Sequence, residues 1–145
     1  MTWPSQKGMD LPFTIQELKQ NTLFLNIEID DKSKIEPALI KVENINGPIL
    51  FIAGKDDRVW PSYKMCQMMK HRLDSLNYKF PVKCLYYENA GHNIISPDLF
   101  PTIDYQYEQT VVGGTNSGNA SAQIDSWNKM IEFLKTYFPI QKPDY

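Results

Sequence analysis

PILFIAGKDD, residues 48–57, is the stretch of sequence that decides the fold. Its first six residues form a continuous apolar run that ends at Gly54, which predicts a strand buried on both faces, as in a parallel sheet. Asp56 and Asp57 follow on the turn after this strand. The carboxyl ends of strands in open parallel sheets are where catalytic and ligand-binding groups gather, so this acidic pair is a candidate site.

The chain after this strand predicts a helix and then a second strand. Residues 62–76 carry four apolar side chains at helical spacing: Met65, Met69, Leu73 and Leu76. We expect Ser62 to be the N-cap of this helix, and residues 82–87 to form the second strand. Strand, helix and strand at this spacing predict a βαβ unit with parallel strands.

Residues 117–137 predict the last helix. Five large apolar side chains recur in this region at intervals of three and four residues: Ile124, Trp127, Ile131, Leu134 and Phe138. We expect this stripe to pack against the sheet. Upstream, residues 22–29 predict a short strand and residues 34–42 a connection or short helix.

The domain organisation expected from these elements is one partial α/β domain over residues 1–145. Within it, residues 1–47 form a lid-like excursion, residues 48–138 the core and residues 139–145 a tail. The core consists of parallel strands with flanking helices.

Composition excludes several classes of protein. Hydrophobic residues make up 42% and charged residues 22%, which is typical of a folded globular chain. A net charge of −2 without a basic cluster argues against binding nucleic acid or an anionic membrane. Two cysteines without metal-ligand spacing predict no metal site and reduced thiols in a cytoplasmic protein. We also expect no cofactor.

The second strand is followed by Asn89-Ala90-Gly91-His92. An acid and a histidine on turns after two strands form the second and third members of a Ser/Cys-Asp-His triad in the order nucleophile, acid, base. We therefore assign His92 as general base and Asp57 as the acid that orients it. Asp56 is assigned to the turn, and Gly91 is expected to let the loop turn sharply.

The 145 residues contain no candidate nucleophile for this triad, because neither form of the nucleophile-elbow motif, Gly-x-Ser-x-Gly or Gly-x-Cys-x-Gly, occurs in the chain. Cys66 and Cys84 fall inside a helix and a strand, where thiols usually pack without reacting. The sequence is therefore interpreted as a fragment, the last third of an enzyme whose nucleophile lies outside it. For Trp60 and Met68, core packing is preferred over lining an acyl site.

Four segments together resemble one branch of the α/β-hydrolase superfamily. They are residues 48–62, Asn89–His92, Gly113–Thr115 and Ala122–Trp127. The resemblance is to the C-terminal domain of acyl-CoA thioesterases and bile acid-CoA:amino acid N-acyltransferases, and runs from about Trp3 to Phe138. It implies the C-terminal part of an α/β-hydrolase fold, incomplete without upstream strands.

The resemblance also implies a site and a substrate. The acid of the family falls on Asp57 and its histidine on His92, with an acyl-CoA or other acyl ester or thioester as substrate. Because the serine or cysteine has no counterpart here, the isolated chain is expected to be inactive. Two alternatives are a carboxylesterase or dienelactone hydrolase-like enzyme, and a non-catalytic remnant that acts as a binding module.

One partner is expected from the sheet itself. The strand at residues 49–53 should have neighbours on both sides, and the sequence supplies one of them, at residues 82–87. An open strand edge is a template for pairing with another chain. We therefore expect self-association through this edge, or pairing with residues 22–29.

Overall fold

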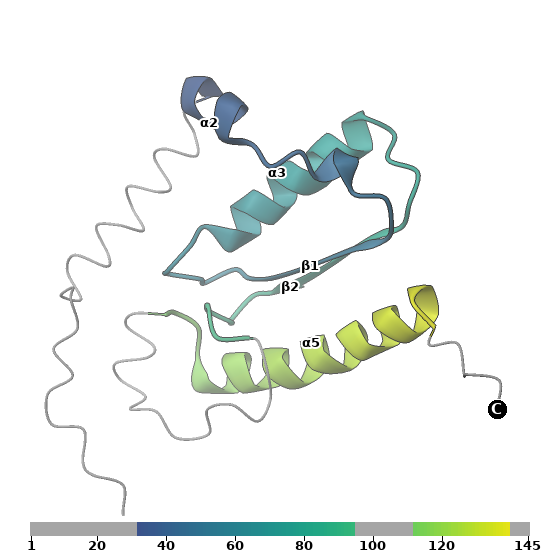
Figure 1. The fold of residues 1–145 in the computed structure, drawn as a ribbon. Coiled ribbons are helices and arrows are strands. Elements are labelled where there is room, and N and C mark those ends of the chain that lie inside the picture. The colour runs from purple at the N-terminus through teal and green to yellow at the C-terminus, as the bar shows by residue number, and fades with distance from the viewer. Residues whose placement is uncertain (1–31, 95–111, 140–145) are drawn as a thin grey trace, which may run out of the picture.

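The computed structural model describes residues 32–94 and 112–139. Its elements are α2 (Lys32–Ala38), the short 3₁₀ helix η1 (Val42–Asn44), β1 (Ile49–Gly54), α3 (Ser62–Ser75), β2 (Val82–Tyr87) and α5 (Asn116–Tyr137) (Figure 1). The strand expected at residues 22–29 lies outside the described residues.

β1 and β2 form a parallel pair, which confirms the predicted βαβ unit with α3 between the strands. The register runs from Ile49 opposite Val82 to Gly54 opposite Tyr87. Within the described ranges the sheet has these two strands alone. The fold is thus a partial α/β fold, as expected.

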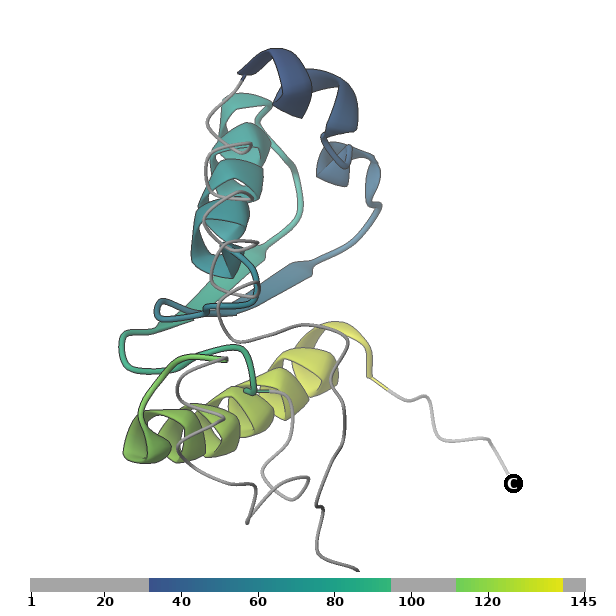
Figure 2. The ribbon, with the colours of Figure 1, turned by 90° about the vertical axis from the view of Figure 1, so that its left-hand side faces the viewer.

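The two faces of the sheet are covered by different helices. Figures 1 and 2 show α3 on one face and α5 on the other. Alternate residues of β1 supply the two cores, because side chains alternate across a strand. One core contains Val42, Ile49 and Leu73, and the other contains Ala90, Ile94 and Ala122.

Burial of β1 on both faces is confirmed only in part. Ile49 and Ala53 are buried, whereas the side chains between them, residues 50–52, are half-buried. The helices cover both faces, but no described strand lies along the second edge of β1. That uncovered edge accounts for the remaining exposure.

The start of α3 differs from the expectation. Pro61, not Ser62, holds the N-cap position, and no side chain caps the helix there. Ser62 is already the first helical residue, and its hydroxyl donates instead to the Gly54 carbonyl at 3.4 Å. Ser62 therefore ties the helix back to the end of β1.

α5 begins one residue before its predicted start and turns a different face to the sheet. Thr115 is its N-cap, with Oγ1 accepting the Gly118 N–H at 3.0 Å. The buried residues are Ala122, Ser126 and Phe133.

No helix of the described segments is long and apolar enough to cross a membrane.

The prediction that the large apolar stripe packs against the sheet is wrong. Four of its side chains are exposed: Ile124 (56%), Trp127 (39%), Leu134 (43%) and Phe138 (52%). The sheet instead receives the face with Ala122 and Ser126, because small side chains let the helix approach closely. Of the stripe, Trp127 borders a cavity that β1 residues also line, and Ile124, Leu134 and Phe138 are exposed.

Candidate active site

Asp57 and His92 come from the loops that follow β1 and β2, and their side chains meet. His92 Nδ1 lies 3.2 Å from Asp57 Oδ2. This contact is within the expected hydrogen-bond reach. It follows from the parallel register, which places the ends of both strands, Gly54 and Tyr87, side by side. The catalytic role of the two residues stays a prediction.

The two oxygens of Asp57 make different contacts. Oδ1 accepts the backbone N–H groups of Val59 and Trp60, both at 3.0 Å. Oδ2 faces His92. Asp57 therefore serves as the turn residue that Asp commonly is, and also as the partner of the imidazole.

The environment favours the ionised form of Asp57. Burial raises the pKa of this carboxyl, but hydrogen bonds with His92, with the Trp60 and Val59 amides and with Ser62 outweigh it, so the pKa lies below its ordinary value. The Asp57 side chain is 5% exposed, whereas that of His92 is 33% exposed. The arrangement is a shielded carboxylate behind a histidine that solvent or substrate can reach.

Gly91 is required at its position by a close approach of two backbone segments, and not by a positive φ angle. Positive φ angles occur at Gly113 and Gly114, and not at Gly91. A Cβ on Gly91 would instead lie 2.2 Å from the Gly113 carbonyl oxygen. The glycine allows two backbone segments to touch directly beside His92.

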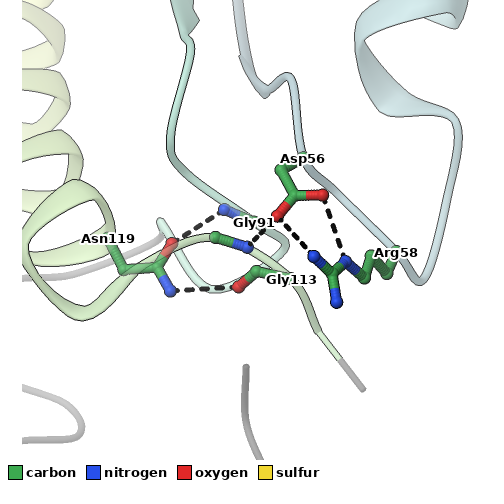
Figure 3. Close-up of polar contacts among 6 residues, drawn as sticks. Asp56, Arg58, Gly91, Gly113 and Asn119 are labelled. Carbon is green, nitrogen blue, oxygen red and sulfur yellow. Dashed lines mark hydrogen bonds and ion pairs between the residues drawn. The ribbon is translucent and has the colours of Figure 1, made fainter. Parts of the chain in front are cut away.

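Three loops are joined by backbone hydrogen bonds around the pair. Asp56 N–H donates to the Ala90 carbonyl at 3.0 Å, and His92 N–H donates to the Val112 carbonyl at 2.8 Å. The Asp56 carboxylate does more than serve its own turn. It accepts the Gly114 N–H at 2.8 Å and pairs with Arg58 (Figure 3).

A cavity of about 310 Å³ borders the pair. Asp57 and His92 line it together with β1 residues and with three side chains of α5: Ser126, Trp127 and Met130. Most of the lining side chains are apolar, which is typical of small-molecule sites with a few polar groups.

Other candidate groups do not join this site. Burial, with a smaller effect of Cys84, raises the pKa of the Cys66 thiol to about 11, so it stays protonated near neutral pH. His71 is exposed on α3, as expected. Trp60 is 47% exposed, so the expected core packing is wrong for it. Across residues 32–94 and 112–139 no cluster of His, Cys, Asp or Glu could hold a metal.

Sequence reasoning missed Asn119 on the first turns of α5. Its side-chain oxygen accepts the Gly91 N–H at 2.7 Å, and its Nδ2 donates to the Gly113 carbonyl at 3.2 Å. An asparagine four residues into a helix has many common roles, so its position in the sequence does not point to His92. The contact arises from the close approach of the loops.

Comparison with known proteins decides the family. Residues 7–138 match the family described as "BAAT / Acyl-CoA thioester hydrolase C terminal". The chain belongs to this family. Since the match spans most of the chain, the resemblance stated from the sequence is confirmed.

Individual relatives agree with this assignment. The chain is 34% identical over 103 residues to a mouse peroxisomal succinyl-coenzyme A thioesterase, covering 68% of this chain and 24% of the relative. It is 32% identical over 111 residues to mouse acyl-coenzyme A thioesterase 6, covering 73% and 26%. A rat acyl-coenzyme A amino acid N-acyltransferase 2 is 31% identical over 105 residues, covering 70% and 25%. The chain thus spans about a quarter of the length of these relatives.

Proposed function

We propose that this chain is the C-terminal portion of an acyl-CoA thioester hydrolase or an acyl-CoA:amino acid N-acyltransferase. In this proposal Asp57 and His92 are the acid and base of a Ser/Cys-Asp-His triad. The observation that carries it is the 3.2 Å contact between His92 Nδ1 and the shielded carboxylate of Asp57, beside a largely apolar cavity. The names of the relatives supply the substrate class.

The two residues would act on opposite sides of one imidazole. Asp57 Oδ2 accepts the Nδ1–H and fixes the tautomer whose Nε2 takes a proton. Nε2 removes the proton of the serine or cysteine as it attacks the thioester carbonyl. The resulting imidazolium, stabilised by Asp57, returns that proton to the departing CoA sulfur, and an acyl-enzyme remains.

The second half of the reaction uses the same pair. His92 removes a proton from the attacking water or amine, and returns it to the serine or cysteine as the acyl group leaves. Water gives the free acid, and an amino acid gives an N-acyl product. Relatives of both kinds match this chain, so the proposal includes both outcomes.

The test is the activity of the longest reading frame that contains these 145 residues. Release of CoA from a series of acyl-CoA esters would be followed with a thiol reagent, with and without free amino acids, and mass spectrometry would detect N-acyl products. We expect turnover that falls about a thousandfold or more in His92→Ala. Turnover that survives in His92→Ala would refute the assignment.

The isolated chain supplies a second arm of this test. Because it contains no nucleophile elbow, we expect no hydrolysis of acyl-CoA above a His92→Ala control. Equal hydrolysis of p-nitrophenyl esters and acyl-CoA by the longer protein would favour a general esterase. Binding of acyl-CoA without turnover by the longer protein would favour a binding module.

A cytoplasmic location is part of the proposal and needs its own test. One relative is named as peroxisomal. Fluorescence microscopy of the tagged full-length protein, compared with a peroxisomal marker, separates the two locations.

A further inference from the structure

α5 presents a row of three polar side chains to the loop that carries His92. Asn119, Gln123 and Ser126 are spaced at i, i+4 and i+7, which places them on one face of the helix. This face is the one that packs on the sheet, since Ala122 and Ser126 are buried.

Each side chain of the row contacts a backbone group within two residues of His92. Asn119 Oδ1 accepts the Gly91 N–H at 2.7 Å, and Gln123 Nε2 donates to the Asn93 carbonyl at 2.8 Å. Ser126 Oγ lies 3.3 Å from the carbonyl oxygens of both Ile94 and Gln123, which share its one hydroxyl hydrogen, and Ser126 is 2% exposed. The backbone is therefore held immediately before and immediately after the histidine.

Asn119 also connects this row to the loop behind it (Figure 3). Its Nδ2 donates to the Gly113 carbonyl at 3.2 Å, while Asp56 accepts the next N–H, that of Gly114, at 2.8 Å. Gly114 has φ +79°, and a Cβ there would lie 2.3 Å from Asn119 Oδ1. The side chain of Asn119 thus fills the space between the two loops.

A third of the His92 side chain is exposed. Besides its Nδ1 contact with Asp57, the residue is fixed through its backbone, including the N–H bond to Val112. A shift of the backbone at Gly91 or Asn93 would move Nδ1 away from Asp57. The geometry of the pair therefore depends on α5.

We propose that Asn119, Gln123 and Ser126 are positioning residues, which hold the backbone around His92 so that Nδ1 stays on Asp57 and Nε2 faces the reacting group. The effect of this row on catalysis rests on the proposed function, whereas its effect on the geometry of His92 does not. The role proposed for the three side chains acts through His92, although Ser126 also lines the cavity.

The test compares Asn119→Ala with Asn128→Ala, which removes an exposed asparagine from the same helix. Two readouts come from NMR of the labelled 145-residue chain: the Nδ1–H signal of His92 and amide exchange at Gly91. In Asn119→Ala we expect the Nδ1–H signal to be lost and Gly91 exchange to rise by about tenfold, as for loss of one hydrogen bond. Exchange at Phe51 and Leu85, in the strands, should stay as in Asn128→Ala.

A conservative variant and a second site keep the test decisive. Asn119→Asp retains the oxygen that accepts the Gly91 N–H but replaces the Nδ2 donor to Gly113 by a second acceptor, so Gly91 exchange should be slower than in Asn119→Ala without reaching the wild-type rate. Should Asn119→Ala unfold the chain, Gln123→Ala removes the bond to Asn93 and should likewise abolish the Nδ1–H signal. A signal unchanged in either folded alanine variant would overturn the proposal.

The kinetic readout separates this inference from the proposed function. In the longer protein, Asn119→Ala should lower kcat by about tenfold or more with KM little changed, since the row acts through His92. Activity that depends on His92 but not on Asn119 refutes the positioning role alone. A lost Nδ1–H signal in a protein without His92-dependent turnover refutes the proposed function alone.

Discussion

Asp57 divides its two oxygens between the turn after β1 and the imidazole of His92. The two kinds of contact that a sequence suggests for such an aspartate, with the amides of its own turn and with a nearby histidine, are therefore both made in the structure. That is why residue type and spacing were enough to pair Asp57 with His92. The strand ends fixed the distance, and the turn fixed the direction of the carboxylate.

Replacing Asp57 should separate these two roles. Asp57→Asn can keep the side-chain oxygen that accepts the Val59 and Trp60 amides, whereas Asp57→Ala loses both bonds. We expect the alanine variant to be about 1–2 kcal/mol less stable than the asparagine variant, as for loss of a helix or turn cap. Urea denaturation measures the difference. Equal stabilities would show that the Oδ1 bonds contribute little.

The stability contribution of Asp57 should depend on pH in one direction. Its pKa is lower in the folded chain than the ordinary value of 3.8, so the ionised carboxylate stabilises the fold above that value. This contribution is lost as the pH falls through the folded pKa. The stability gap between wild type and Asp57→Asn should therefore shrink below about pH 4. A gap that widens on acidification would contradict the assigned direction.

Gly91 gives a prediction with a matched control. Gly91→Ala places a Cβ 2.2 Å from the Gly113 carbonyl oxygen, while a Cβ on Gly47 meets nothing within 4 Å. We expect Gly91→Ala to cost about 1–3 kcal/mol or more, and Gly47→Ala to be neutral or slightly stabilising. Thermal denaturation of both variants is the measurement. Similar melting temperatures would mean that the loops separate without cost.

At the scale of elements, the sequence predicted the kind of element well and the packing face of α5 poorly. The periodicity of Ile124, Trp127 and Leu134 correctly indicated a helix, but these side chains are exposed, and Trp127 borders the cavity instead of a core. The inward face contains Ala122 and Ser126, which carry little hydrophobic signal. Which face of α5 packs on the sheet depends on side-chain size and on the polar contacts that Asn119, Gln123 and Ser126 make with the His92 loop. A pattern of large apolar residues reveals neither of these.

The two faces of α5 should respond differently to substitution. Ala122 is 1% exposed and Ile124 is 56% exposed. We expect Ala122→Leu to destabilise the chain by about 1–3 kcal/mol through overpacking, and Ile124→Ser to change stability by less than about 0.5 kcal/mol. Chemical denaturation of the two variants tests this. A large loss for Ile124→Ser would show that the outer stripe is packed against something in solution.

At the scale of the whole molecule, two apolar surfaces have no described neighbour. One is formed by the exposed side chains of Ile124 and Leu134 on α5, and the other is the second edge of β1. Ile49 N–H donates to the Pro81 carbonyl on the β2 side. Because backbone groups alternate between the two sides of a strand, those of Leu50 and Ile52 face the opposite edge.

This edge supports the self-association expected from the sequence, because its backbone groups can pair with a second chain. Light scattering of the 145-residue chain should show a mass above 16.8 kDa that rises with concentration.

Leu50→Lys places a charge on the edge strand and should restore the monomer, since charged side chains discourage strand pairing. Leu76→Lys, at an exposed position after α3, is the control and should still associate. A wild-type chain that stays monomeric at all concentrations would contradict the argument, and a monomer produced by Leu76→Lys alone would place the interface elsewhere.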